Sequence, residues 1–170
     1  MGEKFVKRIS ALMGIALLIA TLGGASNASS NNNGILSGRY VGATSGLEWF
    51  TPTGGEPTKV DLAVSSIGYF DGKGTFFGYM TVAAQFTAAP VSLVCKFTQT
   101  GSYTLNSDDT GTMSVQSVDN SGGCDSLPQT FNIYATQGGS KICFTQTNMN
   151  FTSASGTTNS IVVSGCYDRQ

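Results

Sequence analysis

Apolar and polar side chains alternate along residues 93–105, and this alternation is the clearest pattern in the chain. One set of alternate positions holds Leu93, Cys95, Phe97, Gln99, Gly101, Tyr103 and Leu105, and the other holds Val94, Lys96, Thr98, Thr100, Ser102 and Thr104. Successive side chains of a β-strand point to opposite faces of a sheet, so the pattern predicts one face in a core and one in water. Met113 and Val115 are expected opposite Leu105 and Tyr103, where they would bury the same face.

Seven other segments are predicted to be strands, because they are rich in β-branched and aromatic residues and are bounded by Gly, Asn, Asp and Ser. They lie at residues 37–43, 61–70 and 75–86, around 113–115, and at residues 130–136, 141–147 and 160–167. In the turn Asp71-Gly72-Lys73-Gly74, a two-residue loop at Gly72-Lys73 would place Tyr69 opposite Phe76.

Eight short strands, joined mostly by short turns, predict an all-β fold. We expect an antiparallel up-and-down barrel of about eight strands, because such a barrel needs connections only between neighbouring strands. A β-sandwich is the alternative. The expected organisation is a flexible leader at residues 29–36 followed by a single β-barrel domain at residues 37–170.

The first 28 residues have the features of a secretory signal peptide. Lys4, Lys7 and Arg8 precede an uncharged apolar run at residues 9–22, and small residues follow it. We predict cleavage near Ser29, which would leave an exported chain, secreted or periplasmic, with no stable membrane span.

Four cysteines in an exported chain are expected to form two disulfides. If the turn between the last two predicted strands is centred between residues 154 and 155, Cys143 lies opposite Cys166, and the same register gives an apolar face. We therefore predict the pair Cys143–Cys166, which leaves Cys95–Cys124 by elimination.

The composition argues against several classes of function. The chain after residue 28 has nine acidic and six basic side chains, and the basic ones are scattered singly, so nucleic-acid binding is not expected. Histidine is absent, which removes Ser-His-Asp and Cys-His mechanisms and the commonest metal ligand. Asp108 and Asp109 lack the further oxygen ligands of a calcium loop. We predict no catalytic residue, no metal site and no cofactor.

The favoured interpretation of Glu48-Trp49-Phe50 is a strand or loop whose aromatic residues plug one end of the barrel. The alternative is an acidic residue beside a stacking platform at the mouth of a sugar or ligand pocket. The residues expected to bind a ligand are Trp49, Phe97, Tyr103, Val115 and Ile133. A carboxylate-dependent enzyme using Glu48 or Asp61 is an alternative, although sequence spacing does not show whether two acids converge.

The segment at residues 75–86 carries aromatic side chains on both faces, with Phe76 and Phe86 on one and Phe77 and Tyr79 on the other. A strand that is apolar on both faces either lies under a loop or forms an outer contact surface. Phe77 and Tyr79 are therefore a candidate surface for self-association or for a protein partner.

Three segments carry a resemblance to known proteins: Gly38-Arg39-Tyr40, the hairpin at residues 69–75, and the Gly-x-Tyr and Asp-x-x-Gly-Thr pattern at residues 101–112. In these turns the chain resembles exported bacterial proteins of unassigned function with a lipocalin-like, calycin-type β-barrel. The resemblance spans residues 37–118, implies the fold and carries no catalytic residues. Lipocalins have Gly-x-Trp in the first strand and an Arg late in the chain. The chain departs from this pattern, because Tyr40 takes the aromatic position and Arg169 is the only late Arg.

The expected function is that of an exported, non-enzymatic barrel that binds a small apolar or amphipathic ligand. One alternative is a structural or interaction protein with a filled barrel and a wall that binds itself or a partner. Another is the carboxylate-dependent enzyme. An outer-membrane barrel would instead require apolar side chains outside and a polar lumen.

Overall fold

Strands account for most of the residues that the computed structural model describes, which are residues 31–51, 53–87, 92–147, 150–152 and 158–170. The predicted signal peptide lies outside these residues. The elements in chain order are η2 (Asn33–Ile35), β1 (Ser37–Thr51), β2 (Thr58–Asp71), β3 (Thr75–Phe86), β4 (Ser92–Leu105), β5 (Thr110–Asp119), β6 (Leu127–Thr136), η3 (Gln137–Gly139), β7 (Lys141–Gln146), β8 (Asn150–Thr152) and β9 (Thr158–Arg169).

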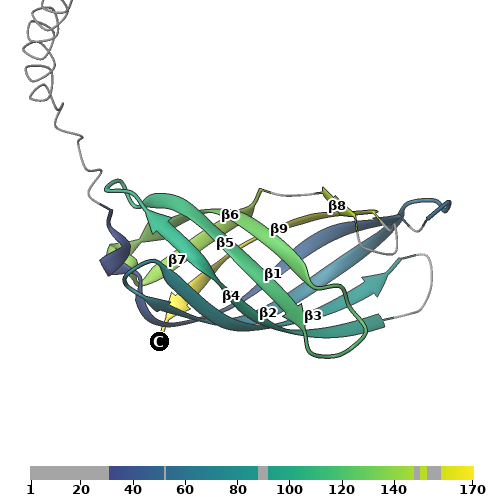
Figure 1. The fold of residues 1–170 in the computed structure, drawn as a ribbon, viewed down its shortest axis with the longest axis horizontal. Coiled ribbons are helices and arrows are strands. Elements are labelled where there is room, and N and C mark those ends of the chain that lie inside the picture. Colours follow the sequence, from purple (N-terminus) through teal and green to yellow (C-terminus); the bar gives the residue numbers. More distant parts are fainter. Residues whose placement is uncertain (1–30, 52, 88–91, 148–149, 153–157) are drawn as a thin grey trace, which may run out of the picture.

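The strands close into an antiparallel up-and-down barrel, as the sequence predicts (Figure 1). Each strand from β1 to β6 pairs with the next strand in the sequence. β7 pairs with β9, and β9 pairs back with β1. The short β8 pairs with the beginning of β9, while β7 pairs with its end, so β7 and β8 share one of the eight strand positions. The β-sandwich alternative is not what forms.

The register of the last hairpin is the one predicted. Cys143 lies opposite Cys166, Ile142 opposite Tyr167 and Phe144 opposite Gly165. The structure holds both predicted disulfides: Cys143–Cys166 joins β7 to β9, and Cys95–Cys124 joins β4 to the connection between β5 and β6.

The register of the β2–β3 hairpin differs by one residue from the prediction, since Tyr69 faces Phe77 and not Phe76. The loop has three residues, because the Asp71 carboxylate accepts hydrogen bonds from the amides of Lys73 (2.7 Å) and Thr75 (2.8 Å). Gly72 and Gly74 have φ angles of +74° and +113°, a left-handed conformation that favours glycine.

The β4–β5 hairpin is shifted by two residues from the prediction, which leaves the inward face unchanged. Tyr103 faces Met113 and Leu105 faces Gly111. Hydrogen bonding continues into the turn, where the Asn106 amide donates to the Thr110 carbonyl (2.7 Å). Asp109 closes this tighter turn with a φ of +65°.

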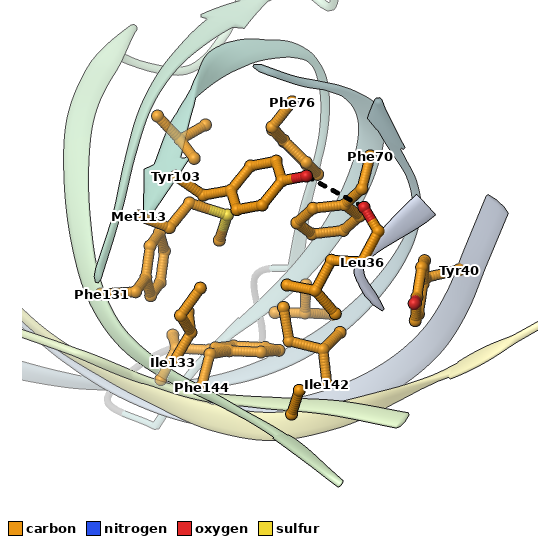
Figure 2. Packing of buried hydrophobic residues seen from close by; sticks show 14 of the residues in the cluster. Leu36, Tyr40, Phe70, Phe76, Tyr103, Met113, Phe131, Ile133, Ile142 and Phe144 are labelled. Carbon is orange, nitrogen blue, oxygen red and sulfur yellow. Dashed lines mark hydrogen bonds between the residues drawn. The ribbon is translucent and has the colours of Figure 1, made fainter. Parts of the chain in front are cut away.

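One end of the barrel, here called the sealed end, is filled by packed side chains (Figure 2). Tyr40, Leu36 and Leu105 are completely buried there. The Tyr103 hydroxyl donates to the Leu36 carbonyl (2.9 Å), and the Leu105 amide donates to Asn33 Oδ1 (2.7 Å). The flexible leader expected at residues 29–36 is therefore wrong for residues 33–36, because η2 and Leu36 cover the sealed end.

The inside of the barrel is mostly apolar, whereas its outside carries polar residues together with exposed aromatic and aliphatic ones, among them Trp49, Tyr79 and Val94. On β4, for example, Phe97 and Tyr103 are buried, whereas Lys96, Thr100 and Ser102 are exposed. Among the described residues, no helix has the length and apolar character needed to cross a membrane.

Candidate functional site

The half of the barrel away from η2 encloses a cavity of about 200 Å³. This half, here called the open end, carries the β1–β2 and β5–β6 connections, on the side of the barrel opposite the C-terminus (Figure 1). Inward positions of eight strands, β1 to β7 and β9, contribute apolar side chains to the wall, among them Leu62, Val64, Met80, Val115, Phe131 and Val163.

The predicted ligand-binding residues separate into three groups. Phe97 and Val115 line the cavity. Tyr103 and Ile133 are buried deeper, in the core of the sealed end. Trp49 lies on the outer wall with 46% of its surface exposed, because Glu48 and Phe50 on either side of it point inward.

Several cavity residues were missed by the sequence reasoning. Leu62 and Val64 lie on β2 and Met80 on β3, and all three line the cavity. The alternation along residues 60–66 carries the signal that they face inward together. That signal does not distinguish an inward residue beside a void from one packed in the core.

A row of polar side chains crosses the inner wall. Gln99 Nε2 donates to Ser117 Oγ (3.1 Å), and Ser117 Oγ donates to Gln129 Oε1 (2.7 Å). All three residues are buried, with at most 8% of their surface exposed. These groups bond one another, so the deep wall offers a ligand mainly apolar contacts.

Tyr167 forms another part of the wall. Its ring lies 4.9 Å from that of Phe144, and its hydroxyl hydrogen-bonds Ser66. Burial raises the pKa of Tyr167, and the hydrogen bond to Ser66 acts in the opposite direction. The ring lies over Gly42, where a Cβ atom would come within 1.7 Å of it, so the ring occupies the space that any larger residue would need.

The mouth of the cavity, at the open end, is acidic. Glu48 on β1 and Asp125 in the β5–β6 connection both line it. Burial raises the pKa of Glu48 to about 7, and the negative charge of Asp125 adds to this shift. Glu48 therefore titrates near neutral pH, where an exposed glutamate is fully ionised.

Asn159 on β9 completes the mouth. Its side chain lines the cavity and only 4% of its surface is exposed. Within the part of the chain that the structure describes, Asn159 Oδ1 has no hydrogen-bond partner. A buried acceptor without a donor is energetically unfavourable, so this oxygen marks a position where a donor would be stabilised.

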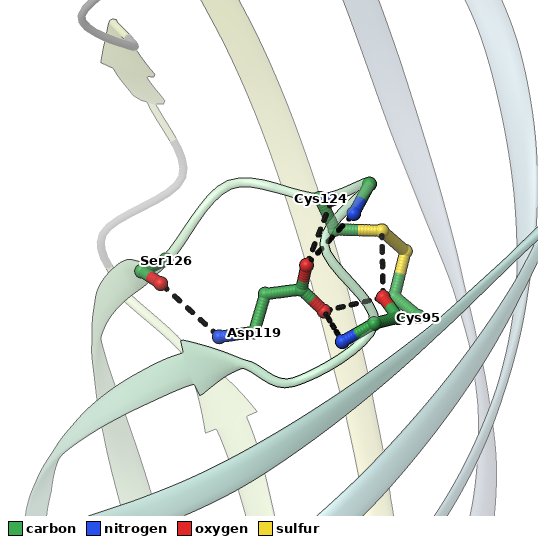
Figure 3. Close-up of a disulfide and its surroundings, with 6 residues drawn as sticks. Cys95, Asp119, Cys124 and Ser126 are labelled. Atoms are coloured by element: carbon green, nitrogen blue, oxygen red, sulfur yellow. Dashed lines mark hydrogen bonds between the residues drawn. A yellow bond between two sulfur atoms is a disulfide. The ribbon is translucent and has the colours of Figure 1, made fainter.

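The β5–β6 connection is fixed over the mouth by Asp119 and by the Cys95–Cys124 disulfide (Figure 3). The Asp119 carboxylate accepts hydrogen bonds from the amides of Gly123 (3.0 Å) and Cys124 (3.0 Å) and from Ser121. The hydrogen bonds from Ser121 contribute most to holding the pKa of Asp119 well below its usual range. Asp125 follows directly, so its backbone position is set by this turn.

The two acids considered for an enzyme, Glu48 and Asp61, lie on opposite faces of the barrel wall, and the acid that shares the cavity mouth with Glu48 is Asp125. Asp61 is on the outer wall, where it pairs with Lys59 at 3.0 Å, whereas Glu48 points into the barrel. In the described residues, no group of three or more Cys, Asp or Glu side chains is placed to hold a metal ion.

The outer wall carries a cluster of exposed aromatic residues, as predicted for β3. Phe77 and Tyr79 lie with ring centres 5.0 Å apart, and Tyr69 of β2 is 6.3 Å from Phe77. Between 37% and 50% of the surface of each of these three residues is exposed. We call this the β2–β3 aromatic cluster.

Comparison with known proteins adds no functional assignment. The chain matches no protein-family model, and neither the search of curated proteins nor the search of solved structures gave a significant match. Function must therefore be inferred from the geometry of the cavity and of the outer wall.

Proposed function

We propose that this protein is a non-enzymatic binding protein that holds a small apolar or amphipathic molecule inside its barrel. The observation that carries the proposal is the cavity of about 200 Å³, which is sealed at one end by η2 and reached through a polar mouth. Ligand sites of proteins share this combination of an apolar wall with a few polar groups.

The size of the cavity limits the ligand. A cavity of roughly 150 Å³ lined by apolar side chains holds benzene. The present cavity of about 200 Å³ therefore suits one ring or a short alkyl chain, with any polar group outside it.

We further propose that the barrel is lipocalin-like and works in the periplasm or outside the cell. The two disulfides support an oxidising compartment. The lipocalin-like proposal rests on the turn motifs at residues 38–40, 69–75 and 101–112.

Blocking the cavity tests the proposed function. Val115 points into the cavity and Val118 on the same strand is 48% exposed on the outside. In isothermal titration calorimetry of the mature protein, we expect Val115→Trp to abolish binding of octanol and Val118→Trp to leave it unchanged. If Val115→Trp does not fold, Val115→Phe takes its place. Equal binding by the inward and outward variants, or no binding by the unmodified protein, would contradict the proposal.

The β2–β3 aromatic cluster supports a second candidate function, self-association or partner binding through the outer wall. Sedimentation equilibrium of the double variant Phe77→Ser/Tyr79→Ser tests it. We expect a concentration-dependent dimer in the unmodified protein that the variant lacks. If the unmodified protein is a monomer at every concentration, self-association is contradicted as a function.

A further inference from the structure

We propose that the molecule bound in the cavity is a cationic amphiphile, with a short apolar tail inside the barrel and a hydrogen-bond-donating ammonium group at the mouth. This proposal rests on the ligand-binding function proposed above. It adds the charge, the orientation and the contacts of the ligand.

The charge of the mouth is the first observation. Among the described residues that line the cavity are two carboxylates, Glu48 and Asp125, and no Lys or Arg. Apolar walls strengthen the interaction of a charge at the mouth, because they exclude water. A cation is therefore attracted to the mouth, and a carboxylate or phosphate head group is repelled from it.

The unpaired oxygen of Asn159 is the second, independent observation. Phe50 on β1 lies opposite Asn159 on β9, and Glu48 lies opposite Ile161. Glu48 and Asn159 are thus diagonal neighbours on the inward face of adjacent strands, within reach of one small group. Asn159 Oδ1 is buried without a partner in the described part of the chain.

The three groups at the mouth match the chemistry of an ammonium group. Glu48 and Asp125 accept hydrogen bonds when ionised, and Asn159 Oδ1 is an acceptor. An ammonium group has donors and no acceptor, so each of its hydrogen bonds finds an oxygen here. A carboxylate would face three acceptors and no charged donor.

The polar groups along the wall determine the orientation. Gln99, Ser117 and Gln129 bond one another, and Tyr167 bonds Ser66, so these polar groups are already engaged. An ammonium group placed among them would lose its hydration without gaining a full set of acceptors. The tail therefore enters first, against Val64, Met80 and Val115, and the head stays at the mouth.

The experiment compares three probes with the same tail and different heads. Octylamine, octanol and octanoate are titrated by calorimetry into the mature protein at pH 8 and low ionic strength, where Glu48 is ionised and octylamine is protonated. We expect octylamine to bind about tenfold more tightly than octanol, as a charge-assisted hydrogen bond would give, and octanoate to bind least.

Variants of residues at the mouth test whether these residues cause the preference for octylamine. Glu48→Gln and Asn159→Ala should each reduce the preference for octylamine over octanol to about twofold. Asp61→Asn, which removes an exposed acid from the outer wall, should leave the preference unchanged. If Glu48→Gln does not fold, Asp125→Asn, which removes the carboxylate in the β5–β6 connection, makes the same test.

The outcomes separate this proposal from the function on which it rests. Equal binding of octylamine and octanol, or tightest binding of octanoate, would overturn the cationic ligand and leave the binding function in place. Tight binding of calcium alone that Glu48→Gln abolishes would also overturn it, because the mouth would then be a metal site. Binding of none of the three probes would overturn both proposals.

Discussion

Glu48 lies between two aromatic or apolar neighbours on β1, and the strand alternation decides its role. Because Glu48 and Phe50 face inward, Trp49 faces outward, and the carboxylate and not the indole ring contributes to the cavity. The sequence favours aromatic residues that plug one end of the barrel here, with a pocket mouth as the alternative, and in the structure Glu48 lines the cavity. The sequence does not show which neighbours of Glu48 share its face, because the predicted first strand ends at residue 43 whereas the observed β1 continues to Thr51.

The raised pKa of Glu48 has a consequence for stability. An acid whose pKa is raised on folding is protonated more readily in the folded state, so stability is greatest below the unfolded value near 4.5 and falls as pH rises to about 7. We expect the free energy of unfolding to decrease by roughly 2 kcal/mol over this window. Urea unfolding at a series of pH values measures it.

Glu48→Gln should remove most of this decrease, because glutamine does not titrate. Asp61→Asn is the matched control, as Asp61 is exposed on the outer wall and should leave the slope unchanged. A slope in Glu48→Gln equal to that of the unmodified protein would show that Glu48 is not the group responsible.

The turn of each hairpin determines whether its strand register can be predicted from the sequence. The last hairpin was predicted correctly because Cys143 and Cys166, and the apolar pair Ile142 and Tyr167, agree on one register. The β2–β3 hairpin had no such second constraint. There the Asp71 carboxylate selects a three-residue loop, a hydrogen-bonding preference that alternation does not reveal.

The Cys95–Cys124 disulfide should control the mobility of the β5–β6 connection. In the variant Cys95→Ser/Cys124→Ser, the backbone amides at positions 123 and 124 should exchange with solvent about tenfold faster, because only hydrogen bonds to Asp119 then hold them. Hydrogen exchange followed by mass spectrometry measures this.

Cys143→Ser/Cys166→Ser is the control for that experiment, since this disulfide joins β7 to β9 and does not touch the connection. It should lower the free energy of unfolding by about 2–4 kcal/mol and leave local exchange in the β5–β6 connection unchanged. Faster exchange there in both variants would mean that the connection opens only with the whole barrel.

At the scale of the whole molecule, the barrel has a packed end and a hollow end. The all-β barrel with eight strand positions was predictable, because alternation and short turns are local signals. The position of the cavity was not. It depends on which inward side chains η2 and Leu36 cover, and the sequence suggested a flexible leader for those residues.

The sealed end should therefore depend on η2. A chain beginning at Ser37 loses completely buried Leu36 and the oxygen of Asn33 that accepts from the Leu105 amide. We expect the free energy of unfolding to fall by about 3 kcal/mol, from lost apolar burial and an unsatisfied amide. Thermal unfolding followed by circular dichroism measures the change.

A chain beginning at Asn31 retains all of η2 and is the matched control, with an expected melting temperature equal to that of the mature protein. Equal melting temperatures for the chains beginning at Asn31 and Ser37 would show that η2 lies on the barrel without stabilising it.

Closure of the barrel by β1 and β9 sets an order of events during biosynthesis. Tyr40 pairs with Arg169, so the first strand cannot complete its hydrogen bonds until nearly the whole chain has been made. Contacts so distant in sequence form late and slowly. From the time β1 is made until β9 pairs with it, β1 presents one unpaired edge, and this edge is exposed to edge-to-edge aggregation.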